Sequence, residues 1–147
     1  MLFQDCICFA LGRASRTVGK IYRERLAEFG LTQTQFFLLI ALFEEDGIQI
    51  TPLADKVALD KSTLTGLLDR LERDGLIERA AAPGDRRALQ IRLTEKAQAL
   101  REPLTTIYDE TNSYFLSQLT DDERIGFDRA IGKLELLGGV ESLRAAP

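Results

Sequence analysis

The sequence contains no histidine and only two cysteines among its 147 residues. Without histidine, the chain has no imidazole to ligate a metal or to act as the general base of a Ser-His or Cys-His pair. Cys6 and Cys8 alone supply neither a zinc tetrad nor a disulfide framework, which favours a reducing, cytoplasmic setting. We therefore expect a protein that is not an enzyme and that holds no metal and no cofactor.

Long apolar runs are missing as well. No hydrophobic run approaches the roughly 18 residues that span a membrane, and the N-terminus lacks the features of a signal peptide. With 45% hydrophobic and 29% charged residues, the composition is that of a globular protein and not of a disordered chain. We expect one compact domain that has no membrane partner.

The distribution of charge is uneven. The whole chain has a net charge of −4, but residues 51–101 carry ten basic and eight acidic side chains and are net positive. An acidic composition argues against indiscriminate binding to nucleic acid. A locally positive segment is compatible with one specific nucleic-acid site.

Helical periodicity dominates the chain. Capping and turn residues predict helices over residues 4–29, 32–43, 51–58, 60–74, 94–118 and 120–138. Thr51 followed by Pro52 is typical of a helix start, and Pro103 predicts a bend in its helix. Short strands are expected over 48–50, 76–79 and 89–93, the last with Leu89, Ile91 and Leu93 on one face.

The order of two short helices and a hairpin predicts a winged helix-turn-helix. The fold class is therefore mainly α with a small β-hairpin wing and long N- and C-terminal helices. The helix over 60–74 has a leucine stripe at positions 64, 67, 68 and 71, which is expected to be buried. Its opposite side is small and polar and ends in arginines, as a helix in the major groove requires. The candidate DNA-facing residues there are Ser62, Thr63, Thr65, Gly66, Arg70 and Arg73.

The predicted hairpin adds a second candidate contact. Asp85, Arg86 and Arg87 lie at or just after its tip. An arginine on a projecting hairpin can enter the minor groove, where the potential is most negative. Asp85 is unusual beside DNA unless it pairs with an arginine and holds it in place. Asp69, on the same side of the helix as Arg73, is also unusual beside DNA. Its carboxylate either accepts a hydrogen bond from a cytosine amine or points away from the DNA.

These segments carry a resemblance to a known family. Residues 60–76 read DKSTLTGLLDRLERDGL and residues 84–95 read GDRRALQIRLTE. The D-x-R of the wing, at Asp85 and Arg87, and the strand end at Leu93 and Thr94 resemble the MarR family of transcriptional regulators. The resemblance implies a homodimer that binds double-stranded DNA at a pseudo-palindromic site and regulates transcription, with repression the expected outcome. It implies that Ser62, Thr63, Thr65 and Arg70 face the major groove and that Arg87, oriented by Asp85, enters the minor groove.

The resemblance also implies how the chain is divided. Residues 1–30 and 95–140 form a helical dimerisation region, residues 31–94 the DNA-binding domain, and residues 141–147 a loose tail. Independently of it, the helices over 4–29 and 111–137 carry more apolar surface than solvated arms need, which favours packing across a two-fold axis. The alternative is that they fold back on their own core.

Cys8 lies in the context Cys-Phe-Ala-Leu, which is similar to the OhrR peroxide-sensing branch of the family, and Tyr22 falls where that branch has a tyrosine bonded to the thiolate. Gly12 and Gln33 depart from that pattern, and the second cysteine of the branch is missing. A redox sensor for organic hydroperoxides is one hypothesis; a small, packed cysteine is the other.

Two alternative hypotheses, one for the signal and one for the function, remain open. A small lipophilic or aromatic effector between the dimer helices and the winged domains is the rival signal, with Tyr22, Arg16 and Phe36 as candidate lining residues. The alternative function is a winged-helix module that binds protein and not DNA; such a module has no salt-dependent DNA affinity.

Overall fold

The structure, a computed structural model, describes residues 2–137, without the side chains of Gln4, Asp85, Arg86 and Arg87. The predicted loose tail, 141–147, lies outside the described residues. The chain divides into two compact units, 1–108 and 109–147, and each is considered by itself. The first unit takes in both the N-terminal helix and the winged helix-turn-helix region.

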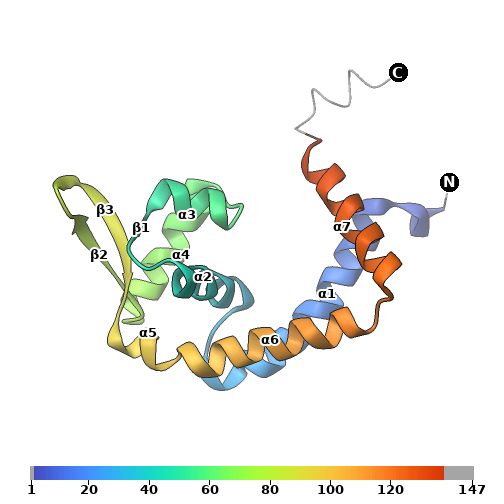
Figure 1. The fold of residues 1–147 in the computed structure, drawn as a ribbon, viewed down its shortest axis with the longest axis horizontal. Coiled ribbons are helices and arrows are strands. Elements are labelled where there is room, and N and C mark those ends of the chain that lie inside the picture. The colour runs from blue at the N-terminus through green and yellow to red at the C-terminus, as the bar shows by residue number, and fades with distance from the viewer. Residues whose placement is uncertain (1, 138–147) are drawn as a thin grey trace. The chain divides into compact units, whose positions relative to one another are not determined.

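The element order agrees with the prediction of a mainly helical chain with a β-hairpin wing (Figure 1). The elements are η1 (Phe3–Asp5), α1 (Ile7–Leu26), η2 (Ala27–Phe29), α2 (Gln33–Glu44), β1 (Ile48–Gln49), α3 (Ile50–Lys56), α4 (Lys61–Arg73), β2 (Ile77–Ala82), β3 (Asp85–Leu93), α5 (Glu95–Ala99), α6 (Arg101–Ser117) and α7 (Asp121–Glu135). α6 begins in the first unit and ends in the second, and α7 lies in the second.

The three strands form one antiparallel sheet in the order β1-β3-β2. Ile48 pairs with Ile91 and Ile77 with Leu93, so the apolar residues of the strands come together. The prediction that Leu89 shares the buried face with Ile91 and Leu93 is wrong, because Leu89 is 50% exposed. A register irregularity in β2, between Ala81 and Ala82, interrupts the alternation near the end of the hairpin.

Side-chain caps start four helices where the sequence places them. Thr32, Asp60, Thr94 and Thr120 each accept a hydrogen bond from the backbone N–H three residues on, which satisfies a donor that the helix leaves unpaired. The predicted start at Thr51 is wrong. α3 begins at Ile50, directly after the β1 pairing, and Gln49 stands at its N-cap without a side-chain hydrogen bond.

The predicted long helix from Thr94 is two helices. α5 ends at Ala99 and α6 begins at Arg101. Pro103 has no N–H to offer the carbonyl of Ala99, so the helical hydrogen bonding breaks just before the proline. The bend predicted near Pro103 therefore lies at Leu100.

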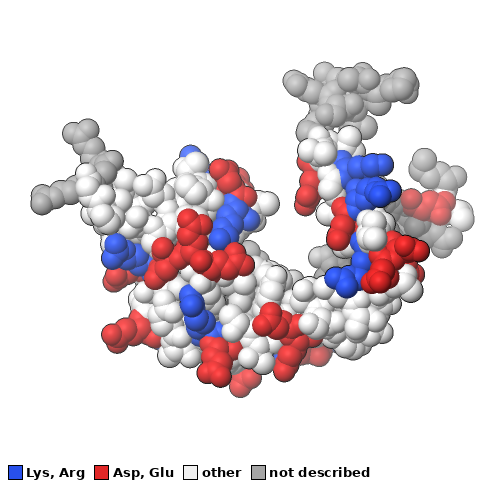
Figure 2. Space-filling model, in the orientation of Figure 1, with Lys and Arg blue, Asp and Glu red and all other residues white. Residues whose placement is uncertain are grey.

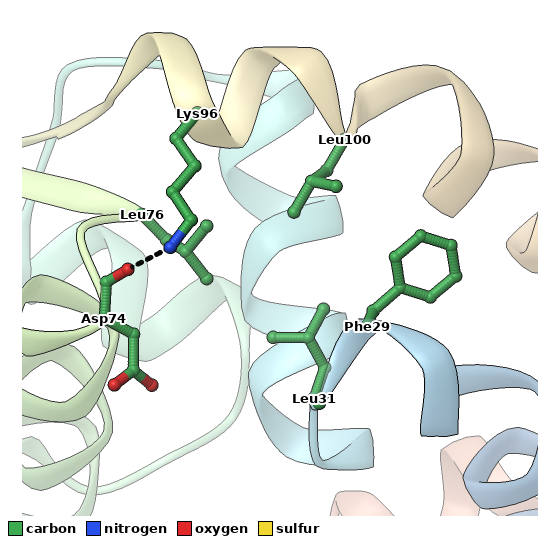
Figure 3. A pocket seen from close by; sticks show the side chains of 7 residues that line it. Phe29, Leu31, Asp74, Leu76, Lys96 and Leu100 are labelled. Atoms are coloured by element: carbon green, nitrogen blue, oxygen red, sulfur yellow. Dashed lines mark hydrogen bonds between the residues drawn. The ribbon is translucent and has the colours of Figure 1, made fainter.

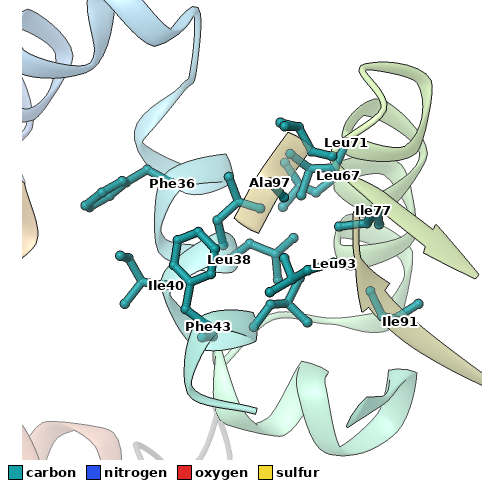
Figure 4. Packing of buried hydrophobic residues seen from close by; sticks show 14 of the residues in the cluster. Phe36, Leu38, Ile40, Phe43, Leu67, Leu71, Ile77, Ile91, Leu93 and Ala97 are labelled. Carbon is teal, nitrogen blue, oxygen red and sulfur yellow. The ribbon is translucent and has the colours of Figure 1, made fainter. Parts of the chain in front are cut away.

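The core of the first unit is built around α2. Eight of its residues are buried, and α2 packs against α1 and β3 in a cluster that also includes residues of α3, α4 and α6. Figure 4 shows side chains from α2, α4 and the strands meeting in one cluster. The leucine stripe of α4 is buried as predicted, with exposed fractions between 0% and 9% at Leu64, Leu67, Leu68 and Leu71. This burial fixes which side of α4 faces outward.

Within the described residues, no single helix is long and apolar enough to cross a membrane. The bent pair Ile7–Phe29 with Gln33–Glu44 meets the length and composition criteria together, but α2 is the core helix of the first unit, and such helices commonly pass them.

Candidate DNA-binding interface

The N-terminus of α4 is held by Asp60. Its carboxylate accepts hydrogen bonds from the backbone N–H of Thr63, at 2.9 Å, and from the Thr63 hydroxyl, at 2.6 Å. These bonds hold the pKa of Asp60 below its ordinary value. Because the folded pKa is lowered, the contribution of this cap to stability is present at neutral pH and is lost as the pH falls through that pKa.

The outward side of α4 is polar and exposed along its length. The six candidate DNA-facing positions are all exposed: Ser62, Thr63, Thr65, Gly66, Arg70 and Arg73. These side chains differ in their hydrogen bonds within the chain. The Thr65 hydroxyl donates to the carbonyl of Lys61 at 2.7 Å, whereas no described side chain pairs with the guanidinium of Arg70. A Cβ added at Gly66 meets nothing within 4 Å, so nothing in the chain itself requires glycine there.

An arginine that the sequence analysis missed connects the wing to α4. The guanidinium of Arg79, in β2, bonds to Asp69 at 2.7 Å and also to Glu72, and the Arg79 backbone N–H donates to Glu72 at 3.3 Å. The Arg79 side chain is only 18% exposed. Asp69, whose negative charge is unusual beside DNA, therefore forms an ion pair within the domain. We call Arg79, Asp69 and Glu72 the wing clamp.

The other end of α4 is fastened to α5. The Thr94 hydroxyl donates to the carbonyl of Gly75 at 2.7 Å, and the Lys96 ammonium donates to the carbonyl of Asp74 at 2.7 Å. The two accepting carbonyls lie at the C-terminus of α4, where helix carbonyls lack partners and a cation is favoured. Gly75 itself has φ +73°, the left-handed conformation that ends the helix. α4 is thus held at its start by Asp60, along one side by the wing clamp and at its end by α5.

The backbone of the predicted wing residues lies at the hairpin turn, as expected from the sequence. Asp85, Arg86 and Arg87 are the first three residues of β3, directly after the turn at Pro83 and Gly84. Their side chains lie outside the described residues, so their predicted pairing and minor-groove role stay predictions. On the face of the first unit in Figure 2, basic and acidic patches interleave and do not form one basic surface.

The two cysteines lie at the start of α1, and both are free and exposed. Cys6 is the N-cap residue and Cys8 lies in the first turn, so only Cys8 is on the helix. Tyr22 lies fourteen residues further along the same helix, about 21 Å away along the axis, and is buried against Phe36 and Phe37. Burial raises the pKa of Tyr22, with Tyr108 adding in the same direction and Arg25 opposing it. Within one chain, Cys8 and Tyr22 are not brought together.

Comparison with known proteins agrees with this geometry. A family model described as MarR family matches residues 31–89. The chain is 33% identical over 132 residues to the HTH-type transcriptional regulator MgrA of Staphylococcus aureus, covering 89% of this chain and 88% of MgrA. It is 35% identical over 118 residues to TtmR of Methylorubrum extorquens, an HTH-type transcriptional regulator; this match covers 80% of the chain but only 60% of TtmR.

Solved structures extend the likeness to complexes with DNA. The S. aureus MepR–DNA complex has a TM-score of 0.79 at 27% identity, covering 88% of this chain and 96% of that one. Overoxidized AbfR bound to DNA has a TM-score of 0.73 at 29% identity, covering 90% and 92%. The chain belongs to the MarR family, whose members are DNA-binding transcriptional regulators and not enzymes.

Proposed function

We propose that the protein is a homodimeric repressor that binds a pseudo-palindromic operator through α4 and the wing. The observation that carries this proposal is the outward side of α4, which is polar and exposed while the opposite leucine stripe is buried. Ser62, Thr63, Thr65, Gly66 and Arg70 contact base edges and backbone in the major groove. Arg73, Arg86 and Arg87 contact phosphates and the minor groove, with Asp85 orienting Arg87. A DNA-binding regulator acts in the compartment that contains the DNA. This agrees with the cytoplasmic location expected from the sequence, which stays a prediction.

A dimer is supported by the apolar side chains that the terminal helices leave exposed. Ile7 is 60% exposed in α1, and Ile125 and Phe127 are each 56% exposed in α7, which has no buried residue. Exposed apolar surface of this kind marks an interaction surface. We assign residues 1–30 and 95–140 to dimerisation and residues 31–94 to DNA binding.

The operator is found by selecting duplexes from a random-sequence library with the purified protein. The proposal predicts enrichment of an inverted repeat whose half-sites are about one helical turn, roughly 34–36 Å, apart. Enrichment of a single half-site contradicts the dimer, and no enrichment contradicts sequence-specific binding.

Arg70→Ala is expected to weaken binding to the selected operator by about 1–3 kcal/mol, roughly fivefold to 150-fold, because a base-edge contact is lost. Binding to a scrambled duplex is expected to fall much less, since that affinity comes from phosphate contacts. Fluorescence anisotropy at one stated salt concentration measures both. Lys56→Ala, an exposed change in α3 that lies outside the proposed DNA contacts and outside the residues assigned to dimerisation, is the control and is expected to leave both affinities unchanged. Equal losses on the two duplexes reduce Arg70 to a phosphate contact.

Ile125→Glu combined with Phe127→Glu is expected to convert the dimer to a monomer, because two charges replace exposed apolar side chains at the proposed interface. Sedimentation velocity measures the change, with circular dichroism to verify the helix content. Leu89→Glu replaces one exposed apolar side chain of the wing by a glutamate and is expected to leave the dimer intact. A double variant that stays dimeric, or a monomeric wild-type protein, contradicts the assignment of α7 to dimerisation.

Release from DNA is proposed to follow a signal, either oxidation of Cys8 or a small effector. Cys8 is exposed in the first turn of α1, and oxidation adds a polar group where the proposed interface is apolar. Organic hydroperoxide is expected to lower the operator affinity of the wild-type protein, with recovery on adding thiol. Cys8→Ser is expected not to respond, whereas Cys6→Ser responds normally. If the wild-type protein ignores hydroperoxide, Cys8 has no sensing role.

The effector hypothesis rests on a pocket of about 390 Å³ among α2, α3 and α6. Its lining is mostly apolar and includes Phe37, Ile40 and Tyr108, with Lys56 and Glu44 as the charged members. Phe36, one of the lining residues expected from the sequence, is fully buried in the core, and its neighbour Phe37 takes that place. A small lipophilic or aromatic compound is the ligand class that fits these walls.

A further inference from the structure

The start of α6 follows a break in the helical hydrogen bonding. α5 ends at Ala99, and Pro103 has no N–H to offer the carbonyl of that residue. α5 itself is fastened to the end of α4. Figure 3 shows the Lys96 ammonium bonded to the backbone carbonyl of Asp74, and Leu100 at the junction of α5 and α6. Because the hydrogen bonding across this junction is incomplete, α5 alone does not set the direction of α6.

Arg101, the first residue of α6, connects this helix to α2. Its guanidinium donates a hydrogen bond to the backbone carbonyl of Phe43 and lies over the ring of the same residue, with Cζ 5.3 Å from the ring centroid. Phe43 is in the last turn of α2, where carbonyls lack a partner within the helix and a cation is favoured. A planar guanidinium can make the hydrogen bond and the ring contact together. The start of α6 is therefore joined to the end of the core helix.

The other contacts of α6 with the first unit are apolar. Leu104 and Ile107 are buried in the core cluster. Apolar burial is not directional, so these side chains hold α6 against the core, whereas the hydrogen bond of Arg101 restricts its angle. α6 continues as one helix to Ser117, in the second unit. A change of angle at Arg101 is therefore carried into the residues that we assign to dimerisation.

We propose that Arg101 is a positioning residue for DNA recognition, which sets the angle between α6 and the winged domain and hence the half-site spacing that the dimer accepts. α4 packs in the same cluster as α2, so an angle that is fixed relative to α2 is also fixed relative to α4. The two α4 helices of a dimer must be about one duplex turn apart, and each added base pair changes the half-site separation by about 3.4 Å and the rotation by about 35°. The inference rests on the proposed homodimer at a pseudo-palindromic operator.

Lys56 provides a matched control at the same end of α2. Its ammonium lies 3.1 Å from a carboxylate oxygen of Glu44 and 3.6 Å from one of Glu45. Lys56 is also a cation at the end of α2, but it comes from α3, which belongs to the proposed DNA-binding domain. Its removal takes away one positive charge, as the removal of Arg101 does, and leaves the connection between α2 and α6 intact.

The test uses the full chain and three duplexes: the selected operator, and the same operator with one base pair inserted or removed at its centre. Fluorescence anisotropy at one stated salt concentration gives the ratio of the affinities. The wild-type protein is expected to bind the altered duplexes at least about tenfold more weakly, because the protein or the DNA must deform to fit. In Arg101→Met this ratio is expected to fall by about threefold or more, since the angle of α6 is less restricted.

Two further variants define the cause. Lys56→Met is expected to keep the wild-type ratio. Arg101→Lys keeps the positive charge but not the planar fork, and its ratio is expected to lie between those of the wild-type protein and Arg101→Met. Circular dichroism verifies that each variant is folded.

An unchanged ratio in Arg101→Met overturns the proposal even where all three affinities are lower, because a uniform loss is what a change of charge or stability alone produces. An equal fall in Lys56→Met overturns it as well. If Arg101→Met does not fold, a wild-type ratio in Arg101→Lys overturns the proposal. A wild-type protein that selects no operator, or that binds the three duplexes equally, contradicts the proposed function and this inference with it, so the two failures are distinguishable.

Discussion

Arg79→Met is expected to lower the affinity for operator DNA by at least about tenfold, equivalent to 1.4 kcal/mol. Two effects act in the same direction. The wing loses the side chain that joins it to α4, and the carboxylates of Asp69 and Glu72 lose the guanidinium that neutralises them. Both carboxylates are on α4 and partly exposed, so they then repel the phosphates of an approaching duplex. Fluorescence anisotropy with the selected operator measures the loss.

The same variant is expected to lose about 1–2 kcal/mol of unfolding free energy, less than for a fully buried pair because its partners are partly solvated. Combining Arg79→Met with Asp69→Asn and Glu72→Gln removes the free charges and is expected to restore part of the DNA affinity. Lys20→Met removes an exposed ion pair with Glu24 in α1 and, as the control for stability, is expected to change the unfolding free energy by less than about 0.5 kcal/mol. Wild-type affinity for Arg79→Met contradicts the role of the wing clamp.

Leu68→Ala is expected to reduce the unfolding free energy by about 2–5 kcal/mol. Leu68 is fully buried in the middle of the leucine stripe, so the shortened side chain leaves a cavity between α4 and the core. A domain of this size has about 5–15 kcal/mol of total stability, and the loss is therefore a large part of it. Urea denaturation followed by circular dichroism measures the change.

Leu89→Ala is the matched control for Leu68→Ala. Leu89 is the same residue type but is half exposed on β3, and its truncation is expected to change stability by less than about 0.5 kcal/mol. Similar losses in the two variants contradict the assignment of the inward side of α4, and with it the assignment of its outward side to DNA.

Features that depend on neighbouring residues could be predicted from the sequence. The caps at Thr32, Asp60, Thr94 and Thr120 involve residues three apart, and the leucine stripe of α4 follows the helical period. The outward side of α4 follows from the inward side. For the same reason, the order of the helices and the hairpin was predictable, and with it the winged helix-turn-helix.

Features that depend on contacts between elements could not be predicted in this way. The wing clamp joins Arg79 to side chains seven and ten residues earlier, in another element, and no periodicity signals such a pair. Leu89 fits the alternation of apolar residues with Ile91. The register irregularity in β2 lies opposite Leu89, however, and the Leu89 side chain is exposed and does not pack in the core. Cys8 and Tyr22 fit a pattern in the sequence, yet the length of α1 separates them.

The central claim is sequence-specific DNA binding by α4 and the wing, and one titration tests it most directly. The affinity of the wild-type protein for the selected operator and for a scrambled duplex is measured by fluorescence anisotropy over a series of salt concentrations. The account predicts that the operator binds at least about 1,000-fold more tightly at physiological salt and that both affinities fall as salt rises. Equal affinities for the two duplexes, or no salt-dependent binding to either, contradict it.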